Sequence, residues 1–328
     1  MESGAFADTT TTSSGTTTSS TTTSVPVTST TVRRVPTAPL TGLPDPSRIT
    51  KHRSALTIKI ENTPEARPQY GIEKADVVYE EIVEGGITRL AAIFNSQVPT
   101  KVGPVRSVRR TDREIVYPIG GIFAFSGGAA YALKSIASAP VKLFDESNSG
   151  NAMFRDPRRY APHNLYANAA LLMKKVGKPR PSPALFTYRS GSSPAPGARV
   201  ASFAVGFASG YATSYSWSAK THSWKRSIFG HPDVTASGTR LSPKNVIVMS
   251  VHYRGGLGVM GSEAVLTGSG SAEVFTGGTV QRATWSRHSL RRPIIYRAGS
   301  GRIIALTRGQ TWVELLDVSE HVTITTVH

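Results

Sequence analysis

The chain has 328 residues, which is enough for two domains of ordinary size, and it contains no cysteine. The absence of cysteine excludes disulfides, thiolate metal sites and a cysteine nucleophile. The formal net charge is +17, and almost all of the excess lies in residues 151–328, which hold 7 acidic and 22 basic residues. This asymmetry predicts either attraction to a polyanion or a solvated, arginine-rich surface.

Residues 1–37 are predicted to form a disordered stalk. Ser and Thr occupy 19 of the 23 positions from 9 to 31, and such a segment cannot bury enough apolar surface to offset the entropy of ordering. Ala5-Phe6-Ala7 has the small-x-small form of a signal-peptidase site. The basic and apolar regions that should precede such a site do not appear before it, so we expect a truncated export signal and an extracellular or envelope location.

The first folded segment predicts a β-hairpin. An alternating run over residues 56–61 is followed by the strand-like runs 77–84 and 87–94, which are joined by Gly85-Gly86. If Glu84 pairs with Ile87, Glu80, Glu84 and Arg89 share one face. Two carboxylates and a guanidinium in this arrangement indicate either an acid/base site or a structural ion-pair network.

The next two motifs predict groups that bind an anion. A helix from about Ser107 would place Arg106 and Arg109 beside its first turn and Asp112 on the same face as Arg109. The alternative is an exposed basic helix. A strand over 122–125 then leads through Ser126, Gly127 and Gly128 into a helical run, a geometry in which backbone N–H groups can hold an oxyanion.

The segment from Phe154 to Asn168 is dense in polar side chains. Pro162 is typical of a first helical turn, so we expect His163 and Asn164 at the start of a helix, near Arg155. These side chains are candidates for a ligand or catalytic site. The alternative is that His163 and Asn164 only cap the helix.

Several long blocks resemble the YerB-like family of bacterial envelope proteins, a group of unknown function whose members are often described as lipoproteins. The blocks are KIENTPEARPQYGIEKADVVYEEIVEGGITRLAAIF, VGPVRSVRRTD, FSGG and FRDPRRYAPHNLY, followed by NVIVMSV, GSGSAEVF and RGQTWVEL. The resemblance covers about residues 38–320. It supplies no catalytic residues. Because this chain has no cysteine to carry a lipid, we expect it not to be a lipoprotein.

The resemblance implies an α+β fold. We expect a layered sheet-and-helix N-terminal domain over 38–178 and a smaller β-rich C-terminal domain over 200–328. The segment 179–199 is rich in Pro, Gly and Ser and is predicted to be a linker. No transmembrane run, metal motif or cofactor motif stands out.

The leading hypothesis is an exported, envelope-associated protein that binds an anionic ligand in its N-terminal domain. The ligand would be a wall glycan, a teichoic-type polymer or a phosphate-bearing fragment. The predicted ligand-binding residues are Arg89, Arg106, Arg109, Ser126, Gly127, Gly128, Arg155, His163 and Asn164.

Two other functions stay open. A hydrolase of envelope glycans would use Glu80 or Glu84 as its general acid, with Asp112 as a partner carboxylate. Nucleic-acid binding rests on charge alone, and we place it third. The sequence therefore leaves open whether the protein is an enzyme.

Overall fold

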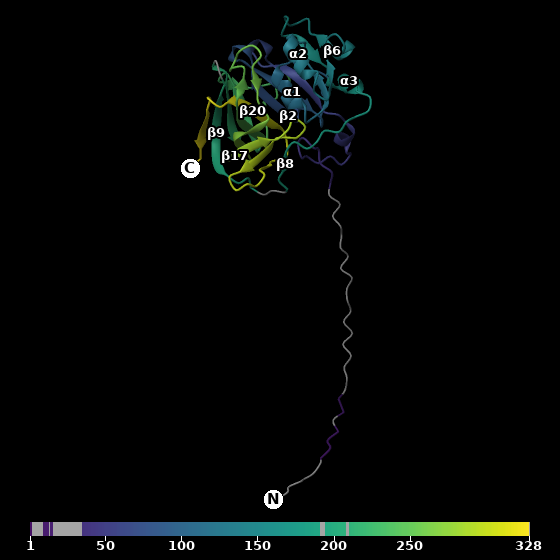
Figure 1. Cartoon of the computed structure of the whole chain (residues 1–328), viewed down its shortest axis with the longest axis vertical. Coiled ribbons are helices and arrows are strands. Elements are labelled where there is room, and N and C mark those ends of the chain that lie inside the picture. The colour runs from purple at the N-terminus through teal and green to yellow at the C-terminus, as the bar shows by residue number, and fades with distance from the viewer. Residues whose placement is uncertain (2–8, 13, 16–34, 191–193, 208–209, 328) are drawn as a thin grey trace. The chain divides into compact units, whose positions relative to one another are not determined.

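A computed structural model of the chain describes residues 1, 9–12, 14–15, 35–190, 194–207 and 210–327 (Figure 1). The predicted stalk and signal-peptide remnant fall mostly outside these residues. The chain divides into two compact units, Met1–Arg34 and Val35–His328, and the fold described below is that of the second unit.

The described residues are mostly β, with three short α-helices. The helices are α1 (Arg110–Val116), α2 (Ala130–Ile136) and α3 (Ala169–Lys174). None of them is long and apolar enough to cross a membrane. The strands are β1 (Leu56–Glu61), β2 (Val77–Ile82), β3 (Thr88–Phe94), β4 (Gly121–Ala124), β5 (Val141–Phe144), β6 (Met153–Arg155), β7 (Leu165–Ala167), β8 (Thr187–Tyr188), β9 (Ala198–Gly206), β10 (Ala212–Ser218), β11 (Ser223–Ile228), β12 (His231–Pro232), β13 (Asn245–Val251), β14 (Tyr253–Arg254), β15 (Glu263–Ala264), β16 (Gly268–Thr276), β17 (Thr279–Arg287), β18 (Ile295–Ala298), β19 (Ala305–Leu306), β20 (Thr311–Asp317) and β21 (Val322–Thr326).

One sheet connects the two halves of the chain. Among the described residues it has 15 strands, in the order β12-β11-β10-β9-β17-β16-β13-β20-β2-β3-β1-β4-β5, with β18 beside β17 and β21 beside β9. The two halves meet where β2 and β20 pair in parallel. In Figure 1 the helices α1, α2 and α3 lie toward one side of this folded unit, and strands β9 and β17 of the sheet lie toward the opposite side.

Both faces of the central strands are buried. Apolar and polar residues alternate along β1, which is typical of a strand with one solvent-exposed face. All six of its residues are nevertheless buried, Lys59 included. On the Lys59 face, α1 covers the sheet and contacts Lys59 through Asp112. On the other face, strand β11 reaches Glu80 on β2 through Arg226. Charged side chains on these strands must therefore find partners inside the protein.

The first helix begins later than predicted. α1 starts at Arg110, and Asp112 caps it by accepting a hydrogen bond of 2.6 Å from the Arg109 N–H. The residues before it are extended because their backbone is already paired: Arg106 N–H donates to Lys59 O, and Val108 N–H donates to Gly127 O. Arg106 consequently lies on an extended segment, not beside a helical turn.

The predicted helix starting at Pro162 is wrong in its first turn. Leu165 to Ala167 form strand β7, which pairs with β6 and bridges to Val102. Helix α3 follows, and Asn168 caps it by accepting from Leu171 N–H at 3.0 Å. The apolar residues that suggested one helix belong to strand β7 and then to helix α3. His163 therefore lies in the turn before β7 and not at a helix N-terminus.

Candidate functional site

The end of β1 gathers several of the predicted site residues around Glu61. The Glu61 carboxylate is 1% exposed, and its Oε2 lies 2.9 Å from His163 Nδ1. Its Oε1 lies 3.1 Å from Arg106 Nε. Because a carboxylate only accepts, the proton of this contact lies on His163 Nδ1, and His163 Nε2 takes no part in it. His163 is 25% exposed, so this nitrogen belongs to a partly open side chain.

Arg89 extends this cluster across the sheet. It lies directly opposite Glu61 on one side and Glu81 on the other, and its Nη1 donates to Ser107 O at 3.0 Å. Burial, together with the charges of Arg109 and Arg106, lowers the pKa of Arg89 to about 10. The positive charges of Arg109 and Arg106 therefore both act on Arg89.

Arg109 is held by Glu84 in the hairpin loop. Its Nε and Nη2 both donate to Glu84 Oε2, at 2.9 Å and 2.7 Å. Burial alone would raise the pKa of Glu84, but the hydrogen bond and charge of Arg109 outweigh it and lower this pKa. Glu84 is thus an ionised partner of Arg109, which is the wrong state for a general acid.

Beneath the arginines lies a buried triad of Lys59, Glu81 and Asp112. Lys59 Nζ donates to Glu81 Oε1 and, at 2.8 Å, to Asp112 Oδ1, and all three side chains are 0% exposed. Burial raises the pKa of Glu81, and the nearby Asp112 adds to that effect, whereas Lys59 opposes it. This triad fixes α1 to the sheet.

The predicted Gly-rich turn borders the same cluster. Ser126 N–H donates to Arg106 O at 3.0 Å, and Gly127 O accepts from Val108 N–H at 2.9 Å. Gly127 has a φ of +104°, which favours glycine. Gly128 lies next along the chain and is exposed. Because the Ser126 N–H is already bonded, the turn braces Arg106.

Arg155 and Asn164 form a separate group. Arg155 Nε donates to Glu146 at 2.7 Å, and its Nη1 donates to Asn164 Oδ1 at 2.8 Å. Among the hydrogen bonds and ion pairs of the described residues, none joins Arg155 or Asn164 to Glu61 or Glu84, the carboxylates that hold Arg106 and Arg109. The predicted ligand-binding residues therefore have two separate sets of partners.

Glu80 points away from the predicted site, because the hairpin register differs by one residue. Glu81, not Glu80, lies opposite Arg89. The turn contains three residues, Glu84 to Gly86, in place of the two predicted, and a one-residue shift moves a side chain to the other face. Glu80 and Asp112 are both 0% exposed and lie on opposite faces, so they cannot act as the predicted pair on a glycan.

Glu80 instead belongs to a buried network with the C-terminal half. Arg226 Nη2 donates to Glu80 Oε2 at 2.7 Å, and its Nη1 pairs with Asp233. Glu80 also lies directly opposite Glu314 on β20, and Tyr215 donates its hydroxyl to Glu314. Burial, together with the charge of Glu80, raises the pKa of Glu314 well above its ordinary range.

Replacing Glu314 by glutamine is expected to remove a pH dependence of stability. The folded chain keeps a proton on Glu314 that the unfolded chain releases, so its contribution is complete below the ordinary pKa of 4.5 and is lost as pH rises. The loss is about 1.4 kcal/mol per pH unit up to the folded pKa. Urea unfolding at pH 5, 6, 7 and 8 should show that the free energy of unfolding of the Glu314→Gln variant rises relative to that of the wild type as pH increases. The control is Glu320→Gln, outside this network, whose free energy of unfolding should vary with pH as that of the wild type does. If the curves of unfolding free energy against pH for Glu314→Gln and the wild type are parallel, the prediction is wrong.

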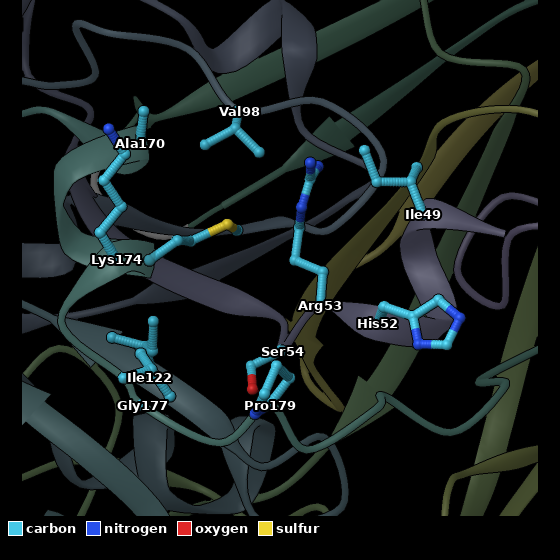
Figure 2. A pocket seen from close by; sticks show the side chains of 12 residues that line it. Ile49, His52, Arg53, Ser54, Val98, Ile122, Ala170, Lys174, Gly177 and Pro179 are labelled. Carbon is cyan, nitrogen blue, oxygen red and sulfur yellow. The ribbon is translucent and has the colours of Figure 1, made fainter. Parts of the chain in front are cut away.

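A cavity of about 390 Å³ opens at the opposite end of β1 from Glu61 (Figure 2). It lies between the 3-10 turn η1 (Ile49–His52) and α3. In Figure 2 the Arg53 side chain extends between Val98 and Ile49, and Lys174 stands on the α3 side. The charged or titratable lining residues are His52, Arg53 and Lys174, and no carboxylate lines it.

This cavity could not be predicted from local motifs. Its basic residues come from segments more than 100 positions apart, and none of them belongs to a motif. Arg53 Nη1 donates to Asn95 O at 2.9 Å, which fixes its side chain across the cavity. The surrounding wall is apolar, with Val98, Ile122 and Met173 among its members. The arrangement places the Arg53 guanidinium in a largely apolar space, with the exposed residues His52 and Lys174 at its edge.

Comparison with known proteins supplies matches over most of the chain. The model "Protein of unknown function (DUF3048) N-terminal domain" matches residues 40–182, and the corresponding C-terminal domain matches 203–313. A relative from Bacillus subtilis (strain 168), named "Putative lipoprotein YerB", is 39% identical over 142 residues. That match spans 42% of this chain and 41% of the relative's length. The crystal structure of YerB from Bacillus subtilis has a TM-score of 0.75 and 24% identity, and it covers 88% of this chain and 99% of that chain, which shows a shared fold.

The relative corrects one expectation. We predicted that the protein is not a lipoprotein, but the relative is named as one, which contradicts that prediction. The absence of cysteine from this sequence therefore does not decide this point. The two matched domains confirm the two-domain organisation, with mostly β structure and few helices, whereas the exact domain limits stay a prediction.

Proposed function

The chain belongs to the DUF3048 family of proteins of unknown function, as its resemblance to YerB-like proteins predicted, and from this premise we propose that it binds a compact organic anion. The proposed site is the cavity lined by His52, Arg53 and Lys174. This keeps the predicted class of ligand and the predicted domain, but it moves the site to different residues.

The observation that carries the proposal is the charge of the cavity lining. Among the described residues no carboxylate lines the cavity, whereas three of the four arginines predicted from the sequence already form ion pairs with carboxylates. Arg106 pairs with Glu61, Arg109 with Glu84 and Arg155 with Glu146. An anion entering those pairs would have to compete with a carboxylate already in place. An anion in the cavity would meet the Arg53 guanidinium, with no carboxylate among the described lining residues to compete for it.

Arg53 has donors to offer such an anion. Only its Nη1 is used among the described residues, by the carbonyls of Asn95 and Ser96. A guanidinium has five N–H donors in a planar fork that matches a carboxylate or phosphate. Because Nη1 is held by the backbone, little side-chain freedom is lost when a ligand binds.

The rest of the lining selects the body of the ligand. Val98, Ile122, Met173 and Val176 present apolar surface, which favours a ring or a short branched chain over a hydroxyl-rich glycan. A volume of about 390 Å³ is near the lower end of the usual range for small-molecule pockets. We therefore propose a monomeric carboxylate or phosphate ester, and a long envelope polymer fits less well.

The Lys174→Glu variant is expected to weaken this binding by about tenfold or more, because it places a repulsive charge at the cavity edge. The probes are benzoate and phenyl phosphate, with benzyl alcohol as the neutral analogue. The readout is the ¹³C-methyl resonance of Met173, which lines the cavity. We expect saturable shifts with both anions and much smaller shifts with the alcohol.

A neighbouring lysine provides the matched control. Lys175→Glu makes the same charge change one residue later, outside the cavity lining, and should bind the probes as the wild type does. Equal losses in the two lysine variants would show a general effect of surface charge. Equal shifts with benzyl alcohol would show an apolar pocket without preference for anions. Either result would overturn the proposal.

A further inference from the structure

We propose a second binding site, for a single-chain amphipathic anion, where the connection between the two domains packs on the C-terminal domain. A cavity of about 510 Å³ opens there, beside residues 184–187. It shares no lining residue with the cavity of Figure 2. This inference is independent of the first proposal, because it concerns another site and another shape of ligand.

The interior of this cavity is apolar. Its walls include Phe186, Ile294, Tyr296, Ile303, Ile304 and Leu306. Phe186 and Tyr296 stack, with ring centroids 6.3 Å apart, and Ile304 is only 6% exposed. Ile303, by contrast, is 47% exposed, so the apolar surface continues from the interior to the mouth. Such a surface suits a hydrocarbon chain that enters from solvent.

The charged or titratable groups of the lining are cationic or neutral. They are Arg287, His288, Arg292 and the neutral Tyr296, and no carboxylate is among the described residues that line this cavity. The carboxylate that pairs with Arg287 is Glu114, 3.8 Å away on α1, and it lines a much smaller neighbouring cavity. His288 and Arg292 are exposed, which places the charge at the rim.

Arg287 keeps the rim in shape. It is 2% exposed, and its Nε donates to Arg292 O at 2.9 Å while its Nη2 donates to Leu290 O at 2.6 Å. Its Nη1 donates to Glu114 O at 2.8 Å. These bonds occupy the guanidinium, so it organises the rim loop, and the exposed Arg292 is the group that meets the head of the ligand.

Charge and shape together select the ligand. A cationic rim above an apolar interior complements a molecule with one anionic end and one hydrocarbon tail, such as a fatty acid. A cationic amphiphile would meet repulsion at the rim, and a neutral one would leave the charge of Arg292 unused. The same anionic chain could come as a free monomer or from a membrane, and the proposal is for the monomer.

Dodecanoate tests the inference below its micelle-forming concentration. Titration calorimetry should give one saturable site, with dodecanol about tenfold weaker and dodecylammonium weaker still. The methyl resonance of Met249 reports the position, because its sulfur accepts the Tyr296 hydroxyl at 3.1 Å. The Met173 resonance should stay unchanged at the same dodecanoate concentrations, which separates this site from the first.

Two variants and a control complete the test. Arg292→Glu should weaken dodecanoate binding about tenfold, and Ala184→Trp, which fills the cavity from an exposed lining position, should abolish it. Arg302→Glu makes the same charge change on an exposed residue outside the lining and should bind normally. Equal affinity for all three head groups, an equal loss in Arg302→Glu, or binding only to anionic vesicles and not to monomers would overturn the inference.

Discussion

Replacing Arg226 by methionine is expected to lower the free energy of unfolding by about 3–5 kcal/mol. The side chain is 0% exposed, pairs with Glu80 and Asp233, and lies 4.6 Å from the ring of Trp312. Methionine would leave Glu80 buried without its cation, and the protein interior solvates this carboxylate poorly. Asp233 would keep its ion pair with Arg67. Urea or thermal unfolding followed by far-UV circular dichroism measures the loss.

The neighbouring residue gives the control for this experiment. Lys225 lies on the same strand with its side chain exposed, so Lys225→Met should change stability by less than about 0.5 kcal/mol. Neutralising the carboxylate left without its cation should recover part of the loss, so the double variant Arg226→Met/Glu80→Gln should be more stable than Arg226→Met alone. A loss below about 1 kcal/mol in Arg226→Met would contradict the idea of a tightly paired buried network.

The Arg226 network also bears on how the two domains hold together. Glu80 comes from the N-terminal domain, and Arg226 and Glu314 come from the C-terminal half. The β2–β20 pairing continues the sheet through the same region. Unfolding of one domain would expose the charged partners of the other, so we expect the wild type to unfold in one transition.

Local features of the sequence predicted the hairpin well and its register poorly. The runs 77–84 and 87–94 do form an antiparallel pair around Gly85 and Gly86. The prediction assumed a two-residue turn, whereas Val83 and Ile87 pair around three residues. Because side chains alternate between the two faces of a sheet, this one-residue difference places Glu81 on the face of Arg89, where the sequence had predicted Glu80.

Contacts between distant segments could not be predicted from local pattern. Glu61 and His163 lie 102 positions apart, and only the pairing of the intervening strands brings them together. The sequence did single out His163, Arg106 and Arg109, because dense polar motifs are visible locally. Lys59 and Glu61 were not predicted as site residues, because the alternation of apolar and polar residues makes them resemble the solvent-exposed face of a strand.

Replacing Lys59 by methionine is expected to cost about 3–5 kcal/mol at pH 7, and the cost should depend on pH. The change leaves Glu81 and Asp112 buried together at 0% exposure. Burial and Asp112 already raise the pKa of Glu81, and removing Lys59 takes away the charge that opposes this shift. The folded variant would then hold a proton that the unfolded chain releases above the ordinary pKa of 4.5.

The sign of this dependence makes the prediction testable without a ligand. A group with a raised folded pKa contributes its stability at low pH and loses it as pH rises, so the deficit of Lys59→Met should shrink between pH 7 and pH 5. Adding Glu81→Gln removes one buried charge, and Lys59→Met/Glu81→Gln should recover stability at pH 7 with a flatter pH profile. A deficit that stays constant across this range would mean that Lys59 contributes through packing alone. If the deficit follows pH as expected, charge compensation by Lys59 is what lets α1, and with it Arg109, dock against the buried face of β1.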